Sequence, residues 1–272
     1  MLPRRTARPS GAYGNICSQM ARNDFIRVKV LAEQGLSDYR ISEITGVARS
    51  TVLRWRHRSD PPGRGRTAAA VSSDWHVPDT PAYCYLLGCY LGDGNVTHKP
   101  PNGWTLRIAC DRRYAGIMDE IIAAMTATFP GGRPTRRQAS RGASDIIGLS
   151  HCWVGKAFPQ HGPGRKHRRL IALDEWQCRL THAHPGALIR GLIHSDGCRA
   201  ENRFKTKLPS GRVAEYHYIR YFFSNLSPDI RQIFTEHCEL LGIRVTQSNH
   251  RNLSVSHRDS VAILEQLVGP KC

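Results

Sequence analysis

Two acidic residues end two short apolar segments of similar sequence. The segments are LLGCYLGDG, over Leu86–Gly94, and IRGLIHSDG, over Ile189–Gly197, and the two acids are Asp93 and Asp196. Carboxylates that lie side by side without apolar cover are ligands that a hard divalent cation such as Mg²⁺ prefers. If the two segments pack together, the sequence predicts a divalent-metal site at these aspartates.

The small residues of each segment indicate how the acids come together. Residues four positions apart share one face of a helix, so Gly88 and Gly92 form one stripe, and Gly191 and Ser195 form another. Facing stripes of small residues let two helix backbones approach closely. We therefore expect the helices to pack through these stripes, and the backbone carbonyls of Gly92 and Ser195 to act as supporting metal ligands.

Both segments resemble the LAGLIDADG motif of homing endonucleases, whose penultimate acid binds the metal. The two acids are 103 residues apart, which fits one repeat of the two-motif, single-chain form of that family. The resemblance implies that Asp93 and Asp196 bind Mg²⁺ and that each serves one DNA strand. Gly94 and Gly197 are expected to turn the chain out of the motif helices, as C-terminal glycines do.

Each motif opens a similar order of predicted elements. In the first repeat these are a helix at 83–92, strands at 95–98 and 104–111, a helix at 114–129, strands at 133–140 and 145–151, and a helical piece at 152–158. After the second motif helix come strands at 198–207 and 215–225, a helix at 227–242, strands at 243–248 and 253–257, and a helix at 259–268. This order is similar to the family's repeat, so we predict an α+β fold with two pseudo-symmetric αββαββα repeats, 74–180 and 181–272, that form a saddle.

A loop rich in cations closes the first repeat. It reads QHGPGRKHRR over Gln160–Arg169, and the second repeat has no obvious equivalent. In the family, a lysine from a loop in this region points towards the active site and stabilises the developing charge on the phosphate. Lys166 is the best positional match and Lys156 is the alternative. Contact of the loop's cations with the phosphate backbone of DNA explains their presence equally well.

The predicted strands carry the arginines of a DNA-binding face. A two-stranded segment with such a face fits the major groove, whereas a solvated edge strand protected by charge is the alternative. The resemblance implies two curved four-stranded sheets that straddle duplex DNA. Their candidate contacts are Arg107, Arg133, Arg136, Arg137, Arg203 and Arg220.

A small all-α domain is predicted before the first motif. The first helix is expected at 24–34, with Ile26, Val30 and Leu31 at helical spacing. The second is expected at 38–45 after the N-cap Ser37, with Ile41 and Ile44 inside. The third is expected at 47–58, with Val52 and Trp55 inside. A glycine turn at Gly46 separates the last two. This spacing resembles a helix-turn-helix DNA-binding domain.

The domain organisation follows from these elements and from composition. On the helix-turn-helix interpretation the outward face of the recognition helix carries Arg49, Ser50, Thr51 and Arg54, whereas a small helical bundle with a solvated basic face is the alternative. The domain covers 24–59. It follows a disordered basic arm at 1–23 and precedes a Pro-, Gly- and Arg-rich linker at 60–73.

Composition indicates the class of partner. The 272 residues carry a formal net charge of +17 with a pI of about 10.0, which favours a polyanionic partner such as double-stranded DNA. The nine cysteines are scattered without a CxxC pair, so we expect reduced thiols and a cytoplasmic location, nucleoid-associated in a bacterium. No apolar run approaches the roughly 20 residues of a membrane span. Two motifs in one chain favour a monomer.

The predicted function is metal-dependent, site-specific cleavage of double-stranded DNA by a homing-type endonuclease, the kind that mobile elements encode. The alternative is a non-cleaving, sequence-specific transcriptional regulator on the same scaffold. An intein is not favoured, because no splicing-junction His-Asn pair is present. A zinc-dependent nuclease would have to use ligands whose spacing is irregular, namely His151, Cys152, His161 and His167.

Overall fold

The computed structural model describes residues 24–59, 76–99, 103–140 and 142–269. Contacts divide the chain into two units, Met1–Ser72 and Ser73–Cys272. The expected basic arm at 1–23 and the linker at 60–73 lie outside the described residues. So do 100–102 and 141, which belong to two expected turns, and 270–272.

The described part of the first unit, 24–59, contains three short helices, at 24–33, α2 (Asp38–Thr45) and α3 (Arg49–Arg56). The Ser37 hydroxyl caps α2 by accepting a hydrogen bond from the Arg40 amide at 3.4 Å. Gly46 ends α2 with a φ of +70°, a backbone conformation that favours glycine. These features agree with the predicted caps.

The buried face of the first helix differs from the expected one. Ile26 is 53% exposed and Val30 is 46% exposed, whereas Phe25 and Val28 are buried. The reason is a tertiary contact, because Trp55 of α3 packs edge-on against Phe25 with ring centroids 5.6 Å apart. Ile44 was also expected inside and is 42% exposed. The helical spacing alone did not identify the side that meets α3.

The second unit contains two αββαββα repeats, which confirms the predicted fold class. The first repeat consists of α4 (Thr80–Asp93), β1 (Gly94–Lys99), β2 (Gly103–Asp111), α5 (Ala115–Thr128), β3 (Thr135–Gln138), β4 (Ser144–Ser150) and α6 (Val154–Ala157). The second consists of α8 (Pro185–Asp196), β5 (Gly197–Lys207), β6 (Val213–Ser224), α9 (Pro228–Leu240), β7 (Thr246–Gln247), β8 (Asn252–Val255) and α10 (Arg258–Val268).

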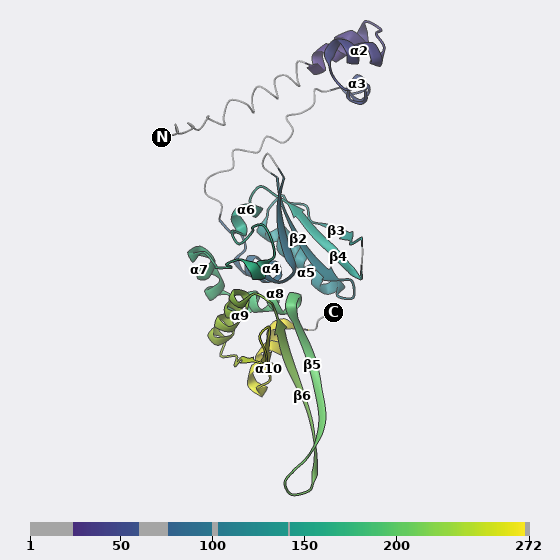
Figure 1. The fold of residues 1–272 in the computed structure, drawn as a ribbon. Helices are drawn as coiled ribbons and strands as arrows, with labels where there is room; N and C mark the ends of the chain where they lie inside the picture. The colour runs from purple at the N-terminus through teal and green to yellow at the C-terminus, as the bar shows by residue number, and fades with distance from the viewer. Residues whose placement is uncertain (1–23, 60–75, 100–102, 141, 270–272) are drawn as a thin grey trace, which may run out of the picture. The chain divides into compact units, whose positions relative to one another are not determined.

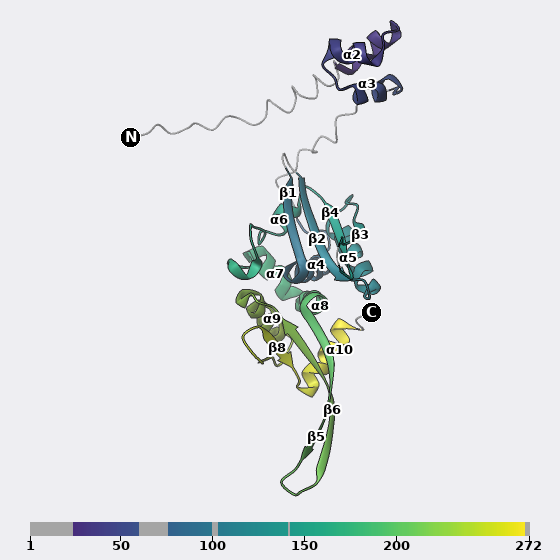
Figure 2. The same cartoon turned by 45° about the vertical axis from the view of Figure 1, so that its right-hand side comes forward.

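Each repeat builds one antiparallel four-stranded sheet. The strand orders are β1-β2-β4-β3 and β5-β6-β8-β7, so the two sheets share one topology. Helices α4 and α8 lie next to each other between the sheets (Figure 1, Figure 2). Helix α4 is buried over its whole circumference from Tyr83 to Leu91, as expected for a helix that is apolar on every side.

The connection between the repeats contains the short 3₁₀ helix η1 (Lys166–Arg168) and the helix α7 (Glu175–Ala183), which was not predicted from the sequence. Asp174 and Gln177 form a capping box at the start of α7. The Gln177 amide also donates a hydrogen bond to the Tyr83 hydroxyl at 2.6 Å, and that hydroxyl donates to the Ala157 carbonyl at 2.8 Å. This buried network attaches both ends of the connection to α4.

Candidate active site

The small-residue stripes of α4 and α8 face each other. A Cβ atom at Gly88 would lie 2.5 Å from the Leu188 carbonyl oxygen, and one at Gly191 would lie 2.1 Å from the Tyr85 carbonyl oxygen. A Cβ at Gly92 would lie 2.1 Å from Oγ of Ser195. Real Cβ contacts do not reach these distances, so glycine is required for the observed separation of the helices.

Gly94 and Gly197 end the motif helices in a different way from the one expected. Gly94 has φ −85° and ψ 154°, and Gly197 has φ −96° and ψ 159°, so both are extended and neither adopts the left-handed conformation. They are the first residues of β1 and β5. Glycine is required because a Cβ at Gly94 would lie 2.4 Å from Cα of Tyr90, and one at Gly197 would lie 2.6 Å from Cα of Ile193. The chain therefore passes from helix to strand without a turn.

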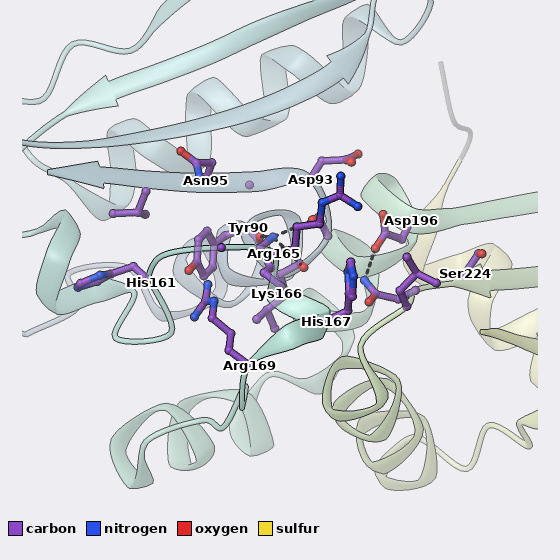
Figure 3. Close-up of a pocket in the computed structure, with 18 residues that line it drawn as sticks. Tyr90, Asp93, Asn95, His161, Arg165, Lys166, His167, Arg169, Asp196 and Ser224 are labelled. Atoms are coloured by element: carbon purple, nitrogen blue, oxygen red, sulfur yellow. Dashed lines mark hydrogen bonds between the residues drawn. The ribbon is translucent and has the colours of Figure 1, made fainter. Parts of the chain in front are cut away.

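The packing of α4 on α8 brings the two motif aspartates to one pocket. Asp93 and Asp196 both line a cavity of about 560 Å³ at the C-terminal ends of the helices (Figure 3). Asp93 is exposed and Asp196 is half-buried. The side-chain amide of Asn225, just after β6, donates a hydrogen bond to Oδ2 of Asp196 at 2.5 Å. No sequence pattern marks Asn225, because only the register of β6 places it next to Asp196.

Lys166 enters the same pocket from the connection between the repeats. Its ammonium donates hydrogen bonds to the carbonyls of Leu91 at 2.9 Å and Gly92 at 2.7 Å, and also to that of Tyr90. Burial lowers the pKa of Lys166 to about 8, and Asp196 and Asp93 oppose that shift. The ammonium thus holds a positive charge at the negative end of the α4 dipole.

Most of the pocket's cations come from the loop that carries Lys166. Arg165, His167 and Arg169 line the cavity with it, and the ring of His161 lies against Trp104 with centroids 4.5 Å apart. Lys156, the alternative to Lys166, lies elsewhere. Its ammonium is 5.3 Å from the centroid of the Trp153 ring, and it lines a different pocket.

The predicted DNA-contacting arginines of sheet β1-β2-β4-β3 do not share one face. Cα partners in an antiparallel ladder point to the same side. Arg107 and Arg137 therefore lie on the face away from the core, whereas Arg136 pairs with buried Ile147 and faces the core side. Nε of Arg136 is 2.8 Å from a carboxylate oxygen of Asp145. Arg136 and Arg137, both expected on one DNA-binding face, therefore lie on opposite faces of the sheet, while Arg133 is exposed before β3.

The arginines of the other sheet also divide between two faces. Arg220 pairs with Ala200, and Arg203 pairs with His217. Along a strand, side chains alternate between faces, so Arg203 and Arg220 point to opposite sides. In the first unit, Arg49, Ser50 and Arg54 are exposed on α3, and Thr51 is half-buried.

A cross-repeat clamp was not predicted from the sequence. Arg190 of α8 makes two hydrogen bonds to the Glu120 carboxylate of α5, at 2.6 and 2.8 Å, and donates to the Leu267 carbonyl of α10 at 2.8 Å. His194 is buried, with Nδ1 3.0 Å from the Tyr85 hydroxyl and Nε2 3.2 Å from the Val268 carbonyl. These contacts fix α8 against elements of both repeats.

The donor set of the pocket fits a hard divalent cation. Mg²⁺ usually keeps several waters and takes one or two carboxylates from the protein, which Asp93 and Asp196 supply. Within the described ranges, no group of three or more His, Cys, Asp or Glu side chains is arranged to hold a metal ion. The four residues of the zinc alternative therefore do not form such a group. The Gly92 carbonyl, an expected supporting ligand, accepts a hydrogen bond from Lys166.

Known proteins of similar structure share little sequence with this chain. No protein-family model and no curated protein matches the sequence. Similar solved structures include the LAGLIDADG meganuclease I-AabMI bound to uncleaved DNA, with a TM-score of 0.43, 10% identity and coverage of 68% of this chain and 82% of that one. Others are the homing endonuclease I-WcaI bound to its DNA recognition sequence (0.43, 9%, 72% and 84%) and the LAGLIDADG homing endonuclease I-SmaMI bound to cleaved DNA (0.42, 8%, 70% and 83%).

The fold assignment rests on the chain's own topology. Two αββαββα repeats, two sheets of identical strand order, and two motif helices packed through small residues define the LAGLIDADG saddle fold. The resemblance predicted from the two motifs is thus confirmed at the level of the fold. Among the described residues, no helix combines the length and apolar character needed to cross a bilayer.

Proposed function

We propose that this chain is a site-specific, metal-dependent endonuclease for double-stranded DNA. The observation that carries the proposal is the meeting of Asp93 and Asp196, one from each repeat, in a pocket lined by cations from a single loop. Carboxylates can hold divalent cations, and the adjacent cations can hold a phosphate. The three similar solved structures named above are LAGLIDADG endonucleases bound to DNA, and the net charge of +17 favours the same partner.

The residues of the pocket have distinct roles in this proposal. Asp93 and Asp196 would hold the divalent ions, and Asn225 orients the Asp196 carboxylate through its hydrogen bond. When bound, such ions supply a nucleophilic hydroxide and neutralise charge at the scissile phosphate. Lys166 holds the C-terminal carbonyls of α4 and keeps a positive charge near the phosphate position. Arg165 and Arg169 would bind the phosphate backbone on either side.

The domains contribute separately. Residues 24–59 form the helix-turn-helix reader in this proposal, with Arg49, Ser50, Thr51 and Arg54 facing DNA. Residues 74–180 and 181–272 each bind one half of an asymmetric site through the exposed arginines of their sheets, and a monomer suffices because one chain holds both motifs. Arg107, Arg137 and Arg220 lie on the sheet faces away from the core, which suits this role.

A non-cleaving regulator is the second candidate. One observation favours it: the Lys166 ammonium already bonds to the Gly92 carbonyl, where a metal ligand was expected. In a chain that has lost nuclease activity, the Lys166 ammonium would supply the positive charge that a metal ion supplies in an active enzyme. DNA binding is common to both candidates, so only cleavage distinguishes them.

The test is cleavage of a randomised plasmid library by the full chain with added Mg²⁺, followed by sequencing of the new ends. Staggered ends at one recurrent sequence are expected, and EDTA should abolish them. The double variant Asp93→Asn, Asp196→Asn should bind DNA without cleaving it. Asp119→Asn, at an exposed carboxylate of α5 outside the pocket, is the matched control and should cleave normally. Sequence-specific binding without new ends in any protein would favour the regulator.

A further inference from the structure

The hairpin formed by β5 and β6 extends well beyond the rest of its sheet. Strands β5 and β6 pair from Gly197–Phe223 to Lys207–Val213, whereas β8 pairs with β6 only over Tyr221–Ser224. Both views show the hairpin projecting as a two-stranded ribbon (Figure 1, Figure 2). A two-stranded ribbon in water is marginally stable by itself, so the chemistry of its two faces indicates what it contacts.

One face of the ribbon is charged, and its charges pair with one another. Arg203 and His217 are cross-strand neighbours, and both lie near Glu201, at 3.1 and 3.5 Å. Lys205 lies 3.5 Å from its neighbour Glu215. The side chains of Arg203 and His217 lower the pKa of Glu201. This face therefore satisfies its charges within the ribbon and has the pattern of a solvated surface.

The opposite face carries aromatic side chains, and we name Phe204, Tyr216, Tyr218 and Phe222 the aromatic face. Phe204 and Tyr216 stack across the strands with ring centroids 5.2 Å apart and planes at 20°. Their side chains remain 46% and 42% exposed. Exposed and adjacent large aromatic rings usually mark an interaction surface.

A single cation is held within the aromatic face. The guanidinium of Arg220 lies 5.7 Å from the centroid of the Tyr218 ring and 5.4 Å from that of Phe222. The Asn202 amide donates a hydrogen bond to the Tyr218 hydroxyl at 3.2 Å. The face thus combines apolar rings with an oriented positive charge, which complements an anionic partner that also presents apolar groups. Duplex DNA has both, because thymine methyl groups lie in the major groove between the phosphate chains.

The aromatic face is continuous with the pocket of the two aspartates. Ser224 has the same strand parity as Tyr216 and Tyr218, and it lines the pocket. The eight residue-to-residue steps from Tyr216 to Ser224 span about 26 Å at about 3.3 Å per step. That distance equals the rise of about eight base pairs at about 3.4 Å each. A duplex with its phosphate at the pocket would therefore pass along the aromatic face, and a two-stranded ribbon fits the major groove.

We infer that the aromatic face recognises thymine 5-methyl groups in the major groove of the outer half-site next to Asp196. The inference rests on the proposed function, which supplies the duplex, and it adds the chemical basis of specificity. Phe204 and Tyr216 make the apolar contacts. Arg220, held by Tyr218 and Phe222, contacts the duplex nearer to the pocket.

The test measures binding in EDTA, so that no cleavage occurs. The full chain first selects duplexes from a randomised library. Deoxyuridine then replaces the thymines of each half-site in turn, which removes only the methyl groups. When deoxyuridine replaces the thymines of the outer half-site next to Asp196, wild-type binding should weaken by about four-fold for each contacted methyl group, corresponding to about 0.8 kcal/mol. The same replacement in the other half-site should leave binding unchanged. The variant Phe204→Ala, Tyr216→Ala should bind thymine and deoxyuridine duplexes equally. His217→Ala, on the charged face of the same ribbon, should keep the wild-type preference.

Three other outcomes would overturn the inference. A wild-type protein that selects a sequence but binds thymine and deoxyuridine duplexes equally would exclude methyl recognition and leave the proposed function intact. A protein that selects no sequence would remove the proposed function as well. A concentration-dependent dimer without DNA, abolished by the double aromatic variant in sedimentation, would show that a second copy of the chain covers the aromatic face.

Discussion

Lys166 combines two tasks that are usually separate. Its ammonium donates to the carbonyls of Leu91 and Gly92, in the last turn of α4, where a helix terminus leaves carbonyls without intrahelical partners. It also brings positive charge to a pocket that contains Asp93 and Asp196. Burial lowers its pKa to about 8, so the group is mostly protonated at pH 7. The structure thus places a cation next to the proposed phosphate position.

Replacing Lys166 should separate binding from chemistry. The variant Lys166→Met should lower single-turnover cleavage by about 10²–10³-fold, the usual cost of removing one preorganised electrostatic group. Binding to the selected duplex in EDTA should change far less, because the other cations of the pocket, such as Arg165 and Arg169, remain in place. Lys156→Met, at the lysine that lies over Trp153, is the matched control and should cleave at the wild-type rate. Equal cleavage by the two variants would rule out a catalytic charge at Lys166.

His237 should make stability depend on pH. It is buried in α9, where Nδ1 donates to the Ile233 carbonyl at 2.7 Å, and burial lowers its pKa. The unfolded chain then binds more protons than the folded chain between the folded pKa and about 6.5. The free energy of unfolding should therefore fall as the pH is lowered through that interval. Each unit of pKa difference contributes about 1.4 kcal/mol.

Urea unfolding at pH 7.5 and pH 5.5 measures this effect. The variant His237→Leu should show a smaller loss of stability on acidification than the wild type. His250→Leu, the same change at an exposed histidine of the turn between β7 and β8, should keep the wild-type dependence. An unchanged pH dependence in His237→Leu would assign the acid sensitivity to other groups.

At the scale of elements, the α4–α8 contact depends on two glycines whose neighbours are backbone atoms. In Gly88→Ala the new methyl group would meet the Leu188 carbonyl oxygen at 2.5 Å, and in Gly191→Ala it would meet the Tyr85 carbonyl oxygen at 2.1 Å. Neither contact can be relieved by a change of rotamer. Each variant should lose about 1–3 kcal/mol or more of unfolding free energy.

The matched control for these variants is Gly148→Ala in β4, where the nearest atom would be 3.7 Å from the new methyl group and the backbone φ is not positive. Urea unfolding should show near-wild-type stability for Gly148→Ala and a clear loss for the other two. Similar stability in all three proteins would mean that the two motif helices do not pack as described.

Periodicity predicted the elements better than it predicted their partners. The alternation in 104–111 identified β2 because Leu106 and Ile108 face a core supplied by their own repeat. The helix at 24–33 was predicted, but its buried side was not. Phe25 is buried because it packs against Trp55 of another helix, α3. Local spacing contains the period of a helix, and the identity of the buried face depends on where the neighbouring helix lies.

The candidate site shows the same division. The two motifs predicted Asp93 and Asp196, because their spacing and flanking small residues are local properties. Asn225 was not predicted. It lies 29 positions after Asp196 in the sequence, and the pairing of β5 with β6 brings it next to that residue. Gly94 was expected to turn the chain out of the motif helix, while the structure requires glycine there for its close approach to Tyr90. The close approach of the two motif helices was predictable from their small residues, whereas the close approach of Gly94 to Tyr90 was not.

At the scale of the whole second unit, the two halves of the pocket are unequal. The loop between the repeats supplies Lys166 and Arg169, whereas the second repeat supplies Asp196, Ser224, Asn225 and Leu226 to the pocket lining and no cation among the described residues. On the endonuclease hypothesis, the strand next to this loop should be cleaved faster. A supercoiled plasmid with the selected site should therefore give nicked circles before linear molecules, with the first cut about ten-fold faster or more. A gel time course that shows linear product without a nicked intermediate would contradict this prediction.

The two units of the chain should contribute separately to DNA affinity. Each phosphate contact releases counterions, so the logarithm of the binding constant falls with the logarithm of the salt concentration by about 0.9 per contact. If Arg49 and Arg54 of α3 contact phosphates, the variant Arg49→Ala, Arg54→Ala should reduce the salt slope by about two and leave the cleaved sequence within the site unchanged. Arg40→Ala, at an exposed arginine of α2 that is 2.5 Å from Glu43, is the matched control and should keep the slope.

A slope that stays at the wild-type value in both variants would mean that the first unit is a helical bundle with a solvated basic face. A reduced slope together with changed base preference would instead place these arginines on base edges, because phosphate contacts carry no sequence information.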